Sequence, residues 1–273
     1  MFKYYIGSLI AVPAKKPSLP MPTPLRYERR ALIIGASSGM GAALARRLGR
    51  AGYVLALVAR RKALLTALCA EINQMNGETL ALSYVHDVND YKAVPDLLRR
   101  IVADLGGLDL VIYAAGVNFP PGLHEYSFEG DRQMLEVNLI GAFAWLNPVA
   151  SLFESARSGQ IVGISSVAGD RGRVGNPGYN TSKAGLATYL EALRNRLTRY
   201  GVNVLTVKPG FVKTDMLAAA QRVMFPITAE KAADDIYRAI RARKQQVYTP
   251  WFWSWIMFVI RNMPSILFRR MSF

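Results

Sequence analysis

A tyrosine and a lysine spaced by about one helical turn offer the first recognisable chemistry in this sequence. Tyr179 and Lys183 lie four residues apart in a stretch, residues 178–197, whose composition predicts a helix, so both side chains share one face. A phenol has an ordinary pKa of about 10, and a neighbouring ammonium group stabilises the phenolate. The pair therefore suits proton transfer at neutral pH, although such pairs also occur by chance on helices.

A serine hydroxyl fits the same chemistry. Ser166 ends a predicted strand, residues 159–166, thirteen residues before Tyr179. The carboxyl ends of the strands line the ligand crevice of an open α/β sheet. Tyr179 would protonate an alkoxide while Ser166 donates a hydrogen bond to the same oxygen. Capping of the following turn is the structural alternative for Ser166 alone.

A glycine-rich turn directly after the first predicted strand indicates a dinucleotide site. Glycines allow a sharp turn and close approach to a phosphate, and the start of the following helix favours negative charge. The order strand, turn and helix is the one that such a site requires, whereas a glycine turn by itself is often a plain loop. With a nicotinamide bound there, the three side chains above predict reduction of a ketone or oxidation of the matching alcohol. The predicted contacts in the turn are Gly35, Ser37, Ser38, Gly39, Met40 and Gly41.

Two arginines at the end of the second strand predict which dinucleotide binds. Arg60 and Arg61 stand where an NAD-selective site usually has an acidic residue for the ribose hydroxyls. A guanidinium pairs well with a phosphate, so the 2′-phosphate of NADP(H) is the expected occupant and NADP(H) is preferred over NAD(H). A solvated strand end is the alternative. Asp87 and Val88 end the third strand and are expected at the adenine edge, although Asp87 also suits a helix N-cap.

The elements that position these residues predict an α/β fold. Short apolar strands alternate with longer amphipathic helices, which is typical of a mostly parallel sheet covered on both faces. Right-handed crossovers then give a single, doubly wound, Rossmann-type domain with seven strands. The expected strands are residues 31–35, 53–59, 79–85, 108–116, 159–166, 202–210 and, at the edge, 245–250.

Composition narrows the function classes. The 273-residue chain is 51% hydrophobic and carries a net charge of +15, which must attract something acidic. Nucleic acid is not expected, because the chain has no nucleic-acid-binding signature. His86 and His124 are far apart in the sequence, so we expect no metal site and take both for surface or cleft-edge residues. Cys69 is the single cysteine, which favours a reducing, cytoplasmic location.

The motifs together resemble the short-chain dehydrogenase/reductase family over residues 28–250. The match comprises GASSGMG at 35–41, AAG at 114–116, VNLIGAF at 137–143, ISSVAG at 164–169, YNTSK at 179–183 and PGFVKT at 209–214. Departures are Ile34 and Tyr113, where the family usually has Thr and Asn, and both positions are expected to brace central strands.

This resemblance implies roles for further residues. Asn138 would complete a catalytic tetrad with Ser166, Tyr179 and Lys183 by holding a water in a proton relay to Lys183, which would also bind the nicotinamide ribose. The resemblance also implies the strand order 3-2-1-4-5-6-7 and homodimers or homotetramers. Other implied cofactor contacts are Ala115, Gly116, Pro209, Gly210, Val212 and Thr214.

The two ends of the chain differ from the central part. Residues 1–27 predict a flexible, proline-rich extension, and residues 251–273 form an aromatic and basic tail with Trp251, Arg269 and Arg270. Such a tail suits a membrane interface. Packing on its own core or on a dimer partner is the alternative. If the tail contacts a membrane, the enzyme works at the inner face of it.

The second half resembles more closely a bacterial subgroup of the family that includes the decaprenylphosphoryl-ketopentose 2-reductase. The shared segments are GDRGR at 169–173, LRNRL at 193–197 and the VYTPWFW ending. A lipid-linked keto-sugar substrate would explain the basic chain, the aromatic tail and an apolar lid at residues 216–225. A long-chain keto lipid is the rival substrate, and a non-catalytic NADPH-sensing or scaffolding protein with the same fold is the rival function.

Overall fold

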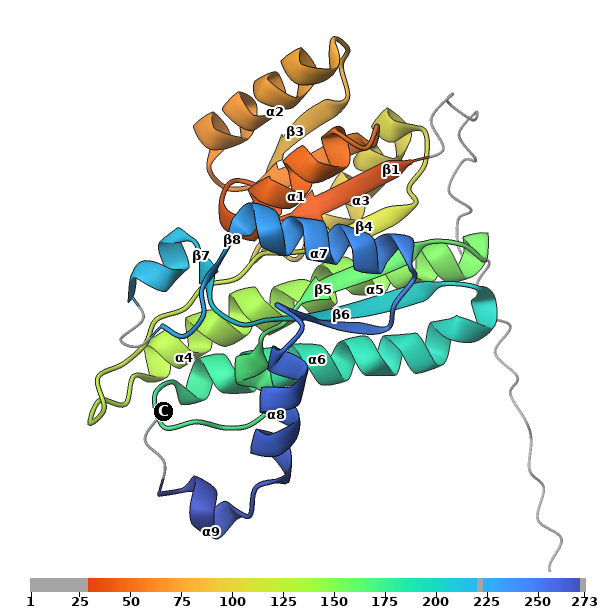
Figure 1. Cartoon of the computed structure of the whole chain (residues 1–273). Coiled ribbons are helices and arrows are strands. Elements are labelled where there is room, and N and C mark those ends of the chain that lie inside the picture. The colour runs from red at the N-terminus through yellow and green to blue at the C-terminus, as the bar shows by residue number, and fades with distance from the viewer. Residues whose placement is uncertain (1–28, 220–222, 271–273) are drawn as a thin grey trace, which may run out of the picture.

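A parallel sheet of seven strands forms the centre of the computed structural model, which describes residues 29–219 and 223–270 (Figure 1). The strand order is β3-β2-β1-β4-β5-β6-β9, with every neighbouring pair parallel. The predicted Rossmann-type sheet and its strand order are therefore confirmed, including the edge strand near residue 246. The strands are β1 (Arg30–Ile34), β2 (Val54–Ala59), β3 (Ala81–Val85), β4 (Leu110–Tyr113), β5 (Gln160–Ile164), β6 (Asn203–Pro209) and β9 (Gln246–Thr249).

Helices cover both faces of this sheet. On one face lie α1 (Gly39–Gly49), α2 (Lys62–Asn76) and α7 (Ala229–Arg241). On the other lie α3 (Val94–Leu105), α5 (Gly141–Ala156) and α6 (Pro177–Leu197). Shorter elements are α4 (Phe128–Leu135), a π-helical turn η1 (Glu136–Ile140), the 3-10 turns η2 (Val167–Gly169), η3 (Thr198–Tyr200) and η4 (Asp215–Ala219), and a small ladder of β7 (Val212–Lys213) with β8 (Ile227–Thr228).

The central strands contribute side chains to two hydrophobic cores, one on each face of the sheet, because successive side chains of a strand point to opposite faces. In β1, Ala31 and Ile33 enter the core under α1, α2 and α7, whereas Leu32 and Ile34 enter the core under α3, α5 and α6. All four side chains are fully buried. This explains why the strands read as continuous apolar runs and not as alternating ones.

The C-terminal tail adds a third, smaller core. Its helices α8 (Trp253–Asn262) and α9 (Ser265–Phe268) project from the body beyond α6 (Figure 1). Trp253, Met257 and Ile260 are buried there together with Val167 and Tyr248. Part of the tail therefore packs on its own chain, which was one of the two alternatives for this segment.

Three features qualify the expectations from composition. Residues 128–156 form one helical stretch long and apolar enough to span a membrane, yet this stretch supplies much of the second core, including Trp145 and Phe153. His86 is buried, and its ring packs edge-on against that of Trp145 with 5.4 Å between the ring centres. Its assignment as a surface or cleft-edge residue was therefore wrong. Cys69 is buried, and burial raises the pKa of its thiol to about 11.

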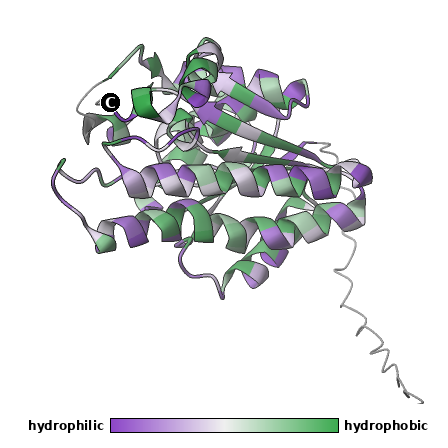
Figure 2. Cartoon of the chain, turned by 90° about the horizontal axis from the view of Figure 1, so that it is seen from below, coloured by the Kyte–Doolittle hydropathy of each residue, from purple (hydrophilic) through white to green (hydrophobic). Residues whose placement is uncertain are grey.

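The predicted extension at residues 1–27 lies outside the described residues, as does part of the proposed lid, residues 220–222. In the remainder of the chain, the long helices show hydrophilic and hydrophobic stripes along their length (Figure 2). Such stripes are typical of amphipathic helices, which bury their hydrophobic side against the sheet and expose the hydrophilic side.

Candidate active site

The glycine turn brings the carboxyl ends of β1 and β4 into direct backbone contact. Gly35 has a φ of +92°, and a Cβ there would lie only 2.4 Å from the backbone nitrogen of Ala115. A Cβ on Gly41 would lie 2.1 Å from the carbonyl oxygen of Gly35. The turn therefore tolerates glycine alone at both positions, and it holds the start of α1 close under the strand end.

The start of α1 is suited to bind an anion. Ser38 is the N-cap residue by position, but its side chain makes no capping hydrogen bond to the helix. The first turn of α1 contains no acidic side chain. The helix dipole and the first backbone N–H groups thus favour a phosphate at this point, and the turn fits the pyrophosphate of a dinucleotide.

The two arginines predicted to select the cofactor have different surroundings. Arg61 donates hydrogen bonds of 3.1 and 3.0 Å to the hydroxyl of Ser37 and a further one to that of Ser38. Arg60 instead pairs with Asp87 at 3.4 Å, and both of these side chains are exposed. Only Arg61 gathers a guanidinium and two hydroxyls into one place, which is a donor set that fits a phosphate monoester.

Asp87 also serves the local backbone. Its Oδ1 accepts a 3.0 Å hydrogen bond from the backbone nitrogen of Asn89, two residues further along. The N-cap role named as the alternative for this residue is not present, because α3 begins at Val94 and its N-cap residue is Ala93; Asp87 instead stabilises the turn that follows β3. The side chain of Val88 is buried in the second core, and its Cβ lies 3.2 Å from a Cβ built on Gly141.

The catalytic tyrosine candidate stands at the first turn of α6. Asn176 caps this helix by accepting a hydrogen bond of 3.1 Å from the backbone nitrogen of Tyr179. Burial raises the pKa of Tyr179, while a hydrogen bond with Ser166 and the charge of Arg173 lower it. The phenol is thus held in its protonated form, and two neighbours moderate that preference.

Ser166 follows β5 and faces Tyr179. Its Oγ accepts a 3.0 Å hydrogen bond from the backbone nitrogen of Ala168, so the capping role exists. A hydroxyl that accepts through a lone pair still has its proton to donate. Ser166 can therefore cap η2 and donate to a substrate oxygen at the same time.

Lys183 lies one turn after Tyr179 on the same face of α6. Its ammonium group donates a 3.0 Å hydrogen bond to the carbonyl oxygen of Ile164 and lies 5.7 Å from the centre of the Tyr179 ring. The side chain is buried, and burial lowers its pKa to about 8. Two of its three protons remain available for other partners.

Asn138 and Gly116 complete this cluster. The Oδ1 of Asn138 accepts from the backbone nitrogen of Val117 at 2.8 Å, and its Nδ2 donates to the carbonyl oxygen of Val117 and to the hydroxyl of Ser182, each at 3.0 Å. A Cβ on Gly116 would lie 3.3 Å from both Asn138 Oδ1 and Lys183 Nζ. Glycine at position 116 therefore leaves the space in which these two groups meet.

The segment after β6 connects the two halves of the predicted cofactor site. The side chain of Thr214 would lie 3.1 Å from a Cβ on Gly39, so this segment reaches the start of α1. Val212 is buried in β7, and Gly210 follows Pro209 under the indole of Trp253, which lies 2.0 Å from a Cβ built on Gly210. Met40 is partly buried and packs on the first core.

Two residues near the candidate site, Arg173 and Asp170, were not predicted from the motifs. Arg173 is half-buried, and its charge and the Tyr179 phenol act on each other. Asp170 is buried and binds Lys208 at 2.5 Å and the hydroxyl of Tyr248 at 2.7 Å. Both lie in the GDRGR segment at residues 169–173, between Ser166 and Tyr179, which carries part of the resemblance to the bacterial subgroup.

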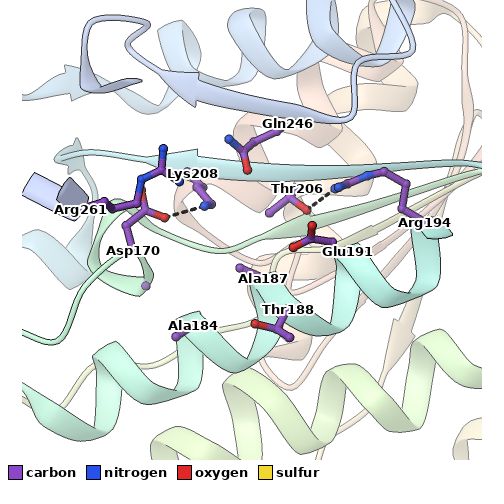
Figure 3. A pocket seen from close by; sticks show the side chains of 11 residues that line it. Asp170, Ala184, Ala187, Thr188, Glu191, Arg194, Thr206, Lys208, Gln246 and Arg261 are labelled. Carbon is purple, nitrogen blue, oxygen red and sulfur yellow. Dashed lines mark hydrogen bonds and ion pairs between the residues drawn. The ribbon is translucent and has the colours of Figure 1, made fainter. Parts of the chain in front are cut away.

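A polar cavity lies behind the catalytic helix and not at the glycine turn. Its volume is about 210 Å³, and α6, β6, β9 and α8 enclose it (Figure 3). Its charged side chains are Asp170, Lys208, Arg194, Glu191 and Arg261. None of the predicted site residues lines it. Asp170 and Lys208 pair with each other, and the Arg194 guanidinium donates a 2.8 Å hydrogen bond to the hydroxyl of Thr206, so these three charged groups already have partners within the protein.

Known proteins are similar to this chain along most of its length. The family model for short chain dehydrogenases matches residues 29–223. An uncharacterised oxidoreductase of Mycobacterium tuberculosis is 31% identical over 89% of this chain and 97% of its own length. Acetoacetyl-CoA reductase of Shinella zoogloeoides is 31% identical over 70% of this chain and 77% of its own length. The solved short-chain dehydrogenase of Sphingobium yanoikuyae in complex with NADPH matches with a TM-score of 0.74 and 25% identity, over 87% of this chain and 97% of that one.

Proposed function

Because this chain belongs to the short-chain dehydrogenase family and is an oxidoreductase, we propose that it reduces a ketone to a secondary alcohol, or catalyses the reverse, with Tyr179 as the proton donor. The observation that carries this proposal is the meeting of four side chains beside the glycine turn. Those side chains are Asn138, Ser166, Tyr179 and Lys183.

Each residue of the proposed site has its own role in the reaction. A nicotinamide held beside these residues would supply the hydride for the carbonyl carbon. The Tyr179 hydroxyl gives its proton to the carbonyl oxygen, which is why a phenol held protonated by burial is useful in this direction. Ser166 donates a hydrogen bond to the same oxygen, and Lys183 places a positive charge near the phenolate that remains.

The proposed cofactor is NADP(H), with NAD(H) bound less well. Arg61, Ser37 and Ser38 form the donor cluster that a 2′-phosphate requires. The Sphingobium yanoikuyae neighbour was solved with NADPH, which supports the same choice. The glycine turn supports a dinucleotide, since its close backbone packing at Gly35 and Gly41 holds the start of α1 where a pyrophosphate would bind.

The proposed substrate is a lipid-linked keto-sugar or a long-chain keto lipid. Its support is an apolar approach to the site: Val223, Met224 and Phe225 are exposed in the segment after η4. Acetoacetyl-CoA, for which one relative is named, is itself a keto compound. The proposal includes a cytoplasmic location, which the single cysteine favours, and a homodimer or homotetramer, which the family resemblance implies.

The test is turnover by the full-length protein. Purified enzyme is mixed with NADPH or NADH and a panel of soluble and lipid ketones, and consumption of the reduced nicotinamide is followed by its absorbance. Tyr179→Phe is expected to lower kcat by about two to four orders of magnitude, because it removes the transferred proton and leaves the ring. Tyr189→Phe is the matched control, since Tyr189 lies on the same helix and its hydroxyl only bonds Asn147 at 2.8 Å.

Binding measurements separate the enzyme from a sensor. If the protein binds NADPH but consumes it with none of the ketones, and Tyr179→Phe changes nothing measurable, the scaffolding or sensing alternative replaces this proposal. If Tyr179→Phe retains full turnover, the proton donor lies elsewhere.

A further inference from the structure

We propose that one face of the C-terminal helix α8, together with the neighbouring aromatic residues, binds the surface of an anionic lipid bilayer. The docking face consists of Phe225, Trp251, Trp255, Phe258 and Val259, and between 56% and 71% of each side chain is exposed. It is independent of the reaction proposed above, because it concerns where the protein is held and not what the active site does.

The helix α8 is apolar on two opposite sides, which a helix that only covers its own core does not need. Its inner side holds Trp253, Met257 and Ile260 in the third core. At about 100° per residue, Trp255, Phe258 and Val259 fall on the opposite side. The outer side therefore has no core of its own to fill, among the residues that the structure describes.

The docking face extends beyond α8 towards the active site. The ring of Phe252 lies 6.3 Å from that of Trp251 and 5.6 Å from that of Phe225. Phe225 ends the segment proposed as a lid, so the tail and this segment form one continuous aromatic surface. Contiguous exposed apolar surfaces of this kind mark interaction sites in soluble proteins.

The charge around the docking face selects its partner. Arg269 and Arg270 are exposed directly after α9, Arg261 is exposed on α8 beside the polar cavity that it also lines, and residues 250–273 contain no aspartate or glutamate. Tryptophan and phenylalanine suit the headgroup depth of a bilayer, and each arginine near an anionic surface adds about 1 kcal/mol of attraction. The face thus combines the two contributions that hold a peripheral protein on a membrane.

A second copy of the chain is the less favourable partner for the same reason. Most homodimers are two-fold symmetric, so this face would meet itself. The three arginines of one copy would then approach those of the other, with no carboxylate of the tail to separate them. The net charge of +15 on each chain adds to that repulsion.

The docking face is held rigidly against the catalytic region. Arg171 donates hydrogen bonds to the carbonyl oxygens of Ile260 and, at 2.6 Å, Met263, and its guanidinium lies 4.0 Å from the centre of the Phe268 ring. On the other side, the Trp253 indole packs on Gly210. The outer side of α8 is therefore fixed in place relative to the segments that follow β5 and β6.

The experiment is flotation of the full-length protein with vesicles of phosphatidylcholine alone and of phosphatidylcholine with phosphatidylglycerol. Wild-type protein is expected to float with the anionic vesicles, and added salt is expected to weaken this binding. Replacing Trp255, Phe258 and Val259 together by Ser is expected to weaken it at least about tenfold, because the apolar contact is lost. Arg269→Gln with Arg270→Gln is expected to reduce the preference for anionic vesicles.

The matched control replaces three exposed apolar residues at the far edge of the sheet, Leu64, Met75 and Val85, by Ser. This variant should float as wild type does, and all variants are compared by thermal unfolding and by NADPH binding. Absence of wild-type flotation, or equal loss in both triple-serine variants, would refute the proposal. If the docking-face variant instead dissociates an oligomer in light scattering while flotation is unchanged, a second copy covers this face and the proposal fails.

Discussion

The acid–base behaviour of Tyr179 depends on a charge that stands outside the catalytic helix. Burial raises the pKa of the phenol, and the Arg173 guanidinium, four residues before α6, lowers it. In ketone reduction the phenol must be protonated, so activity is present below the pKa of Tyr179 and is lost above it. If Tyr179 is the proton donor, as proposed above, the charge at position 173 is expected to lower the alkaline limit of the reaction.

Arg173→Gln is expected to move this alkaline limit to higher pH, because removal of the positive charge raises the pKa of Tyr179 further. The reverse reaction needs the phenolate, so alcohol oxidation should begin at a correspondingly higher pH. Profiles of kcat/KM against pH in both directions measure the shift. Arg173→Lys retains the charge and should leave the limit near its wild-type position; an unmoved limit in Arg173→Gln would show that Arg173 does not act on Tyr179.

Selectivity for the cofactor is expected to depend on one of the two arginines. Arg61→Ala should raise the Kd for NADPH by about tenfold or more and leave the Kd for NADH nearly unchanged, since a charge-assisted hydrogen bond is worth about 1.5–3 kcal/mol. Arg60→Ala should have a small effect, because Arg60 pairs with Asp87 in an exposed position. Fluorescence titration with both dinucleotides measures this, and equal effects of the two variants would contradict it.

Single-residue reasoning from the sequence succeeds where a residue type and its spacing define a role. Tyr179, Lys183 and Ser166 are adjacent in the structure because helix periodicity and strand ends determine where they lie. Arg173 could not be assigned, since its approach to Tyr179 depends on the path of an irregular loop. The burial of His86 could not be predicted either, because it results from the packing of Trp145, far along the chain.

At the scale of elements, a buried ion pair connects the loop after Ser166 to the central sheet. Asp170 follows η2, and Lys208 lies on β6 and Tyr248 on β9, so one carboxylate joins three segments. The Asp170 side chain is 2% exposed and that of Lys208 is 8% exposed. An ion pair in such a place holds its elements in register, and either partner alone would be an unpaired buried charge.

Asp170→Ala is expected to lower the free energy of unfolding by about 3–5 kcal/mol, because it leaves Lys208 buried without a partner. Asp170→Ala combined with Lys208→Met should recover part of that loss. Urea unfolding measures both variants, and kcat should fall in the single variant as the Ser166 loop loosens. Glu129→Ala breaks an exposed pair with Arg132 and should leave the free energy of unfolding nearly unchanged, so a loss similar to that of Asp170→Ala would contradict this explanation.

The elements themselves were predictable for a physical reason. A parallel strand buried on both faces must be apolar at every position, and such runs between helical periods identify each strand in this sequence. The tail was less predictable, because α8 is apolar on two sides and periodicity alone does not say which side packs inward. The burial of Trp253, Met257 and Ile260 against Val167 and Tyr248 decides that.

At the scale of the whole molecule, the third core joins the tail to the catalytic side of the sheet. It contains Val167 from the turn after Ser166, Tyr248 from the edge strand and three residues of α8. No residue of the glycine turn around Gly35 belongs to this third core. Changes in the tail should therefore affect turnover more than binding of the adenosine end of the cofactor.

Trp253→Ala is expected to lower the free energy of unfolding by about 3 kcal/mol and to reduce kcat, while the Kd for NADPH changes little. Trp255→Ala is the matched control two residues away, and it should alter stability by at most about 0.5 kcal/mol, because that side chain is 67% exposed. Chemical unfolding and steady-state kinetics measure the difference. Equal stability of the two variants would mean that the tail unfolds separately from the rest.

The buried position of Cys69 has a practical consequence. A thiol with a pKa near 11 carries almost no thiolate at neutral pH, and its side chain is out of reach of reagents. The natural chain is thus already a background for maleimide labelling at a single chosen point. A dye attached through Val259→Cys would report, by its emission colour, whether the outer side of α8 sits in water or in hydrocarbon.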